Sequence, residues 1–98
     1  MTKKVLLLLC LGLFLISCSN STDEQKKQIS QLEKKNYETA DTNSARELMN
    51  AYLQYANEFP QDSLTPEYLL RAASVTMKLG NGAQAIDIFD RIINQYPS

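Results

Sequence analysis

Histidine and tryptophan are absent from this 98-residue sequence, and cysteine occurs only twice. Without histidine the chain cannot build a Ser-His-Asp triad, an imidazole general base or a site that uses the commonest transition-metal ligand. A glycine-rich phosphate loop is missing as well, because Gly80-Asn81-Gly82 has the pattern of a turn between helices. We therefore expect no enzyme, no cofactor and no metal site.

An excess of positive charge is also lacking. The ten Lys and Arg residues include Lys3 and Lys4, so eight remain beyond residue 17 against 11 Asp and Glu, a net charge of −3. This balance gives no electrostatic reason to expect nucleic acid or an anionic membrane surface as a partner. The hydrophobic content of 44% owes much to one apolar run, Val5 to Ile16.

The first 17 residues have the order of a bacterial export signal. Lys3 and Lys4 supply a cationic start, the apolar run from 5 to 16 follows, and Ser17 ends the segment just before Cys18. The run is shorter than the roughly 20 apolar residues that cross a bilayer. We expect residues 1–17 to be a signal peptide that is removed.

Leu15-Ile16-Ser17-Cys18 resembles the lipobox of bacterial lipoproteins. The resemblance implies that Cys18 carries a diacylglycerol and becomes the first mature residue, held at the membrane by its acyl chains. Ser19 in place of Asp favours the outer membrane, with the protein facing the periplasm. The alternative is an ordinary secretory signal with an incidental cysteine.

Residues 18–43 form a polar segment in which only Ile29, Leu32 and Tyr37 could be buried. A helix from about 23 to 38 is compatible with this composition, but three such residues cannot make a core alone. They could seed a short coiled coil or dock on the following helices. We favour a solvated tether that lifts the folded part from the membrane.

Three helices are predicted for residues 44–98, giving an all-α fold. Ser44 and Glu47 form a capping box for a helix that ends at Phe59. Thr65 is the expected N-cap of a second helix ending near residue 79, with Gly80 in a left-handed conformation, and a third helix spans about 83–96. Apolar spacing predicts their inward faces: Ala45, Leu48, Met49, Tyr52, Tyr55, Ala56 and Phe59; Leu69, Ala72, Ala73, Thr76 and Leu79; Ala85, Ile86, Phe89, Ile92, Ile93 and Tyr96.

Residues 66–98 resemble a tetratricopeptide (TPR) repeat, a helix-turn-helix of 34 residues that stacks into a solenoid. Thr76 and Gly82 depart from the family pattern. Residues 44–60 align with the second helix of this unit. We therefore interpret them as the second helix of a preceding unit. The positions that carry the resemblance are Leu69, Ala72, Ala73, Gly80, Ala85, Phe89, Ile92 and Pro97.

The longer loop between the repeats combines Phe-Pro at 59–60 with Pro-Glu-Tyr-Leu at 66–69 and Arg-Ala-Ala at 71–73. This combination resembles the TPR-like lipoproteins of outer-membrane β-barrel assembly (the BamD type) and the related Tol-Pal coordinator. This resemblance implies an envelope adaptor that binds other proteins in a groove lined by first helices. The corresponding positions are Glu67, Leu70, Ser74, Met77 and Lys78. Taken singly, Leu70 could equally be core, and Glu67 and Lys78 solvated charges.

One and a half repeats are fewer than the three that usually make a stable solenoid. We therefore expect either a truncated chain or a stack completed by a partner or a second copy. The alternative function is a structural envelope lipoprotein in which residues 23–38 form a coiled coil and assemble several copies.

Overall fold

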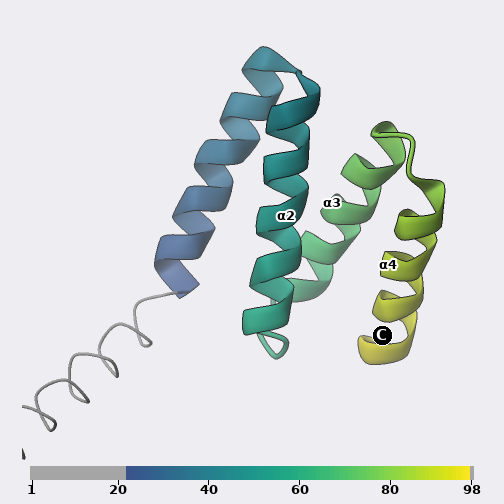
Figure 1. The fold of residues 1–98 in the computed structure, drawn as a ribbon. Helices are drawn as coiled ribbons and strands as arrows, with labels where there is room; N and C mark the ends of the chain where they lie inside the picture. Colours follow the sequence, from purple (N-terminus) through teal and green to yellow (C-terminus); the bar gives the residue numbers. More distant parts are fainter. Residues whose placement is uncertain (1–21, 98) are drawn as a thin grey trace, which may run out of the picture.

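Four α-helices pack in sequence to form the described part of the chain (Figure 1). The computed structural model describes residues 22–97. A first helix, described over residues 22–39, precedes α2 (Thr42–Glu58), α3 (Thr65–Lys78) and α4 (Gly82–Gln95). Each helix runs antiparallel to the one before it, and no strand occurs within residues 22–97. The all-α prediction is confirmed.

α2 begins earlier than the capping box indicated. Asp41 is its N-cap, and the Asp41 side chain accepts a hydrogen bond from the Ser44 amide at 2.7 Å. Ser44 lies inside the first turn, where its buried hydroxyl donates to Asn36 Oδ1 at 3.2 Å. The predicted capping role of Ser44 is therefore wrong, because a carboxylate acceptor is already in place three residues earlier.

Thr65 likewise does not cap α3. The helix begins at Thr65 itself, and the preceding Leu64 makes no side-chain capping bond. The Thr65 side chain is fully buried, and its hydroxyl donates to the Phe59 carbonyl at 2.5 Å. Thr65 thus fastens the end of α2 to the start of α3. Pro66 lies in the first turn of α3, where its missing N–H costs no helical hydrogen bond.

The reversal between α3 and α4 follows the prediction. Gly80 has a φ of +82°, the left-handed conformation that glycine adopts without steric cost. Its amide donates to the Met77 carbonyl at 3.0 Å, and the Asn81 amide donates to the Thr76 carbonyl at 3.1 Å. Asn81 then caps α4 by accepting a hydrogen bond from the Gln84 amide at 3.2 Å.

The helix of residues 22–39 is part of the folded body. Ile29 is only 2% exposed and belongs to the same hydrophobic cluster as residues of α2 and α3, and Leu32 packs against that cluster. The expectation of a solvated tether is therefore wrong for residues 22–39. Two apolar residues are too few to build a core, but they suffice to complete one that α2 and α3 supply.

Tyrosine rings fill the centre of the core. Tyr68 of α3 stacks on Tyr52 of α2 at 5.5 Å between centroids and meets Tyr55 edge-on at 4.9 Å. Ala72 and Ala73 of α3 are fully buried, and such small side chains let neighbouring helices approach closely. The inward face predicted for α3 is thus largely the observed one.

α4 is covered on one side only. Ala85 and Ile88 are buried, but Ile86 and Ile93, both predicted to point inward, are exposed. The reason is that α4 stands at one end of the row in Figure 1, with close backbone contacts to α3 alone among the labelled helices. Its apolar stripe is wider than the surface that α3 covers.

Candidate protein-binding surface

A cleft of about 360 Å³ opens where the first helix ends, α2 begins and α3 ends. The turn at Ala40 and Asp41 forms one wall, and the last turn of α3 forms the other. The cleft exists because residues 22–39 dock against α2 and α3. Its lining residues are Asn36, Tyr37, Ala40, Asp41, Thr42, Ala45, Val75, Lys78 and Leu79.

The lining of this cleft suits a polypeptide segment. Val75 and Leu79 provide aliphatic contacts, and Tyr37 presents an aromatic ring that is 89% exposed. Lys78 is the one cationic side chain in the lining, whereas the Asp41 carboxylate is engaged by the Ser44 amide. A bound segment with an apolar side chain next to an acidic one would match these groups.

A hydrogen-bonded network fixes α3 to the first helix. The Tyr52 hydroxyl donates to Glu33 Oε2 at 2.5 Å, and Arg71 donates to the same oxygen at 2.7 Å. Arg71 also pairs with Glu67 at 3.1 Å and lies 5.7 Å from the centre of the Tyr68 ring. Burial raises the pKa of Tyr52, and the bond to Glu33 raises it further, so this hydroxyl stays protonated as a donor.

A second contact joins the first helix to the loop before α3. Lys26 Nζ lies 3.5 Å from an Asp62 carboxylate oxygen. The Leu64 amide donates to the other oxygen at 2.9 Å, and this hydrogen bond lowers the pKa of Asp62. The first helix is thus tied to the rest of the fold near its start, at Lys26, and farther along, at Glu33. The Ser44 hydroxyl, which donates to Asn36, adds a contact beside the cleft.

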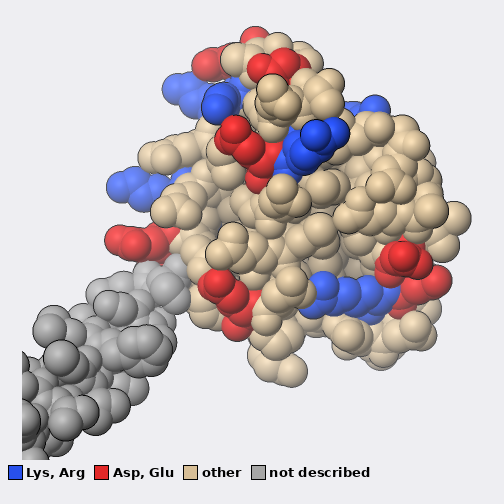
Figure 2. All heavy atoms as spheres, viewed as in Figure 1, with Lys and Arg blue, Asp and Glu red and all other residues tan. Residues whose placement is uncertain are grey.

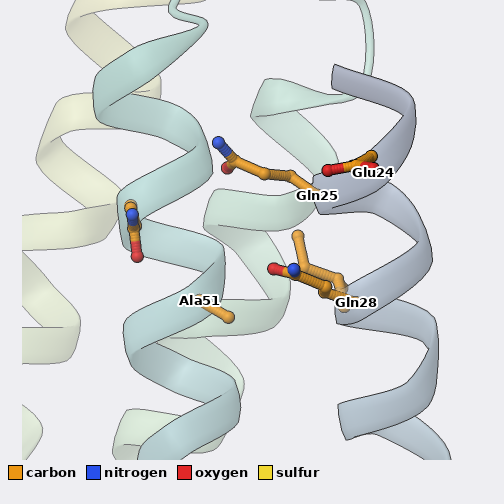
Figure 3. A pocket seen from close by; sticks show the side chains of 6 residues that line it. Glu24, Gln25, Gln28 and Ala51 are labelled. Carbon is orange, nitrogen blue, oxygen red and sulfur yellow. The ribbon is translucent and has the colours of Figure 1, made fainter. Parts of the chain in front are cut away.

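A second cavity, of about 260 Å³, lies between the first helix and α2 (Figure 3). Gln25 reaches across it toward α2 and donates a hydrogen bond to Glu58, which lowers the pKa of that carboxyl. Gln28 and Ala51 complete the walls shown in the figure. Because amide and carboxyl groups dominate its lining, this cavity offers less apolar contact than the cleft.

All five groove residues predicted from the sequence are exposed on α3. Only Lys78 lines the cleft. Glu67 pairs with Arg71. Leu70 and Met77 each follow by two positions, or about 200° around the helix, a residue that faces α2 or the cleft, so both lie on the far side of α3. The five predicted groove residues are Glu67, Leu70, Ser74, Met77 and Lys78.

Sequence reasoning missed the other half of the cleft. From the sequence, Asn36 and Tyr37 belong to the expected tether, and the turn at Asp41 precedes the expected folded part. The available signal was the three-residue spacing of Ile29 and Leu32, which sets both on one side of a helix. Cys18, the predicted lipidation site, lies outside the described residues.

Within residues 22–97 no group of three or more His, Cys, Asp or Glu side chains is arranged to hold a metal ion. No helix in the same range is long and apolar enough to cross a membrane.

Comparison with known proteins identified no relative: no protein-family model, no curated protein and no solved structure matches this chain. The four packed helices therefore define a small all-helical domain without an assigned family.

Proposed function

We propose that this chain is an adaptor of the bacterial cell envelope, anchored by lipid on Cys18 and binding other proteins through TPR-like helical repeats. In this proposal the folded part faces the periplasm from the outer membrane, acts without enzymatic activity and serves outer-membrane protein assembly. The cleft lined by Tyr37, Val75, Lys78 and Leu79 is the observation that carries the binding half.

The order of the helices supports the repeat assignment. The first helix and α2 form one antiparallel pair, α3 and α4 form another, and the two pairs pack in sequence. Buried Ala72 and Ala73 and the left-handed Gly80 occupy the positions where TPR-like units need small residues and a turn. Residues 44–60, expected to be half a unit, have an antiparallel partner in residues 22–39.

The anchor half of the proposal draws its support from the sequence. The cationic start, the apolar run of residues 5–16 and the Leu-Ile-Ser-Cys ending form one continuous lipoprotein signal. The first described helix begins within a few residues of Cys18. The cleft lies at the other end of that helix, about 20 Å along its axis from residue 22, so the helix would hold the cleft away from the anchor.

The alternative of a coiled-coil oligomer built by residues 23–38 is less well supported. Ile29, the most buried residue of that segment, packs inside its own chain. Using it in a coiled coil would require the first helix to leave the core.

Lipid attachment is tested by metabolic labelling with palmitate. We expect label on the wild-type chain and none on a Cys18→Ala variant, because Cys18 is the proposed acylated thiol. Cys10→Ala is the matched control and should keep the label, since Cys10 lies within the segment that is removed. Label that persists in Cys18→Ala would contradict the anchor.

Protein binding is tested by placing a photo-crosslinking amino acid at Tyr37 in the full-length chain. We expect adducts with another envelope protein from this position but not from Asn50, an exposed residue of α2 that lines neither cavity. Lys78→Glu should reduce the adduct several-fold by charge repulsion, and Lys78→Arg should retain it. Equal adducts from positions 37 and 50, or none from 37, would contradict the proposed cleft.

A further inference from the structure

The start of the first helix, the loop between α2 and α3 and the end of α4 lie at one end of the molecule, the lower end in Figure 1. Lys26 of the first helix pairs with Asp62 of the loop at 3.5 Å. The Tyr96 hydroxyl, just after α4, donates to the Pro60 carbonyl of the same loop at 2.7 Å. These contacts join three segments that are distant in the sequence. We call the surface that they form the anchor end, and it comprises residues 22–26, 59–64 and 95–97.

The proposed lipid attachment lies close to this end of the molecule. Only residues 19–21 separate Cys18 from Thr22, where the first described helix begins. An extended chain reaches about 3.5 Å per residue, so Thr22 lies within about 14 Å of Cys18 whatever the conformation between them. The opposite end of the molecule lies about 25 Å farther along the 17-residue α2. The anchor end is therefore the part of the fold nearest to the lipid.

The tip of the anchor end is uncharged and carries an exposed leucine. Leu64, in the loop before α3, is 39% exposed, and Pro60 and Pro97 are exposed as well. On the face that Figure 2 shows, the lower tips of the loop and of α4 are uncharged, and charged side chains lie above them. This tip can therefore touch lipid without taking a charge out of water.

The acidic groups beside the tip are held within the fold. The Asp62 carboxylate accepts a hydrogen bond from the Leu64 amide and pairs with Lys26. Glu58, the last residue of α2, accepts a hydrogen bond from Gln25. No excess of cations is present at this end to attract anionic headgroups. The surface therefore suits apolar contact with the interface of a zwitterionic lipid.

The other exposed apolar surface of the described residues is poorly placed for the same membrane. Met77 and Ile86 are exposed, but they belong to the later part of α3 and the earlier part of α4, away from the anchor end. In Figure 1, α4 stands at the opposite side of the row from the first helix. If the molecule lay on its α4 side, the first helix and the lipid attached before it would be lifted from the bilayer.

We propose that the anchor end rests on the lipid headgroups of the membrane, with Leu64 inserted among them. This inference rests on the proposed lipid anchor at Cys18. One leucine binds a membrane weakly by itself, but the anchor keeps it at a high local concentration beside the bilayer, so the contact persists. The helices then stand upright on the membrane, and the cleft at the other end of the first helix faces away from it.

The test is quenching of an NBD dye by lipids that carry a nitroxide on the headgroup. The full-length chain is purified in its acylated form, labelled on one introduced cysteine and reconstituted into phosphatidylcholine vesicles. We expect the dye at Ser63→Cys to be quenched several-fold more strongly than the dye at Ile86→Cys or Asn43→Cys. All three positions are exposed, Asn43 lies in the first turn of α2 at the opposite end of the molecule, and Ile86 reports the α4 side.

Leu64→Asp should lower the quenching of the dye at position 63 several-fold, because a charge replaces the inserted apolar side chain. Flotation of this variant with the vesicles should be unchanged, since the acyl chains still hold it. Met77→Asp is the matched control, an exposed apolar residue near the other end of α3, and should leave the quenching unchanged.

Flotation separates failure of this inference from failure of the anchor. A wild-type chain that does not float with the vesicles would contradict the anchor and this inference together. If the chain floats, three results would overturn the orientation alone: equal quenching at positions 63 and 43, stronger quenching at position 86 than at 63, or no effect of Leu64→Asp.

Discussion

Ile29→Ala is expected to lower the free energy of unfolding by about 2–5 kcal/mol, the usual cost of truncating a buried isoleucine to alanine. Ile29 is 2% exposed and is the residue of the first helix that belongs to the central hydrophobic cluster. Its truncation leaves a cavity among residues of α2 and α3. It also weakens the packing of the first helix against these two helices. Urea unfolding followed by circular dichroism measures the change.

Lys27→Ala is the control for this experiment, because Lys27 is exposed on the same helix. Its effect should stay within about 0.5 kcal/mol. If Ile29→Ala were as mild as Lys27→Ala, the first helix would be a tether after all, and the cleft would lose one of its walls.

Tyr55→Ala is expected to have the largest effect, a loss of about 3–5 kcal/mol, comparable to the truncation of other large buried aromatics. Tyr55 is fully buried, meets Tyr68 edge-on and lies 5.0 Å from the Phe59 ring. Small domains have only about 5–15 kcal/mol of stability, so the variant is expected to be largely unfolded on warming. Thermal unfolding by circular dichroism is the measurement.

Tyr55→Phe separates the contribution of the ring to stability from that of the hydroxyl. The Tyr55 hydroxyl is buried, and no hydrogen bond of ordinary geometry reaches it within the described residues. Burial raises its pKa, and the Asp62 carboxylate nearby raises it further. Removing a buried hydroxyl without a partner should change stability by less than about 1 kcal/mol. A loss as large as that of Tyr55→Ala would show that this hydroxyl holds a structural hydrogen bond.

The α3–α4 pair could be predicted from sequence because its signals are local. Gly80 marks the turn through its conformational freedom, and Ala72 and Ala73 mark a close approach through their size. Such features depend on a few neighbouring residues. The helix starts were less predictable, since Ser44 competes with Asp41 for the cap and Thr65 has a tertiary partner in Phe59.

The cleft could not be predicted, because it depends on where the first helix docks. Ile29 and Leu32 are compatible with a tether, a coiled coil or a docked helix. Tertiary contacts select the docked helix. Glu33 accepts hydrogen bonds from Tyr52 and Arg71, and Lys26 forms an ion pair with Asp62. The spacing of these residues does not predict the contacts, since the partners lie 19–38 positions apart in the sequence.

Hydrogen exchange at equilibrium tests most directly whether residues 22–39 are a permanent part of the folded body that forms the cleft. In the full-length chain, amides around Ile29 should exchange through the same global opening as amides around Leu69 of α3, with opening free energies within about 1 kcal/mol of each other. The account would be contradicted if the amides around Ile29 exchanged at nearly the rate of an unfolded chain while those around Leu69 stayed protected.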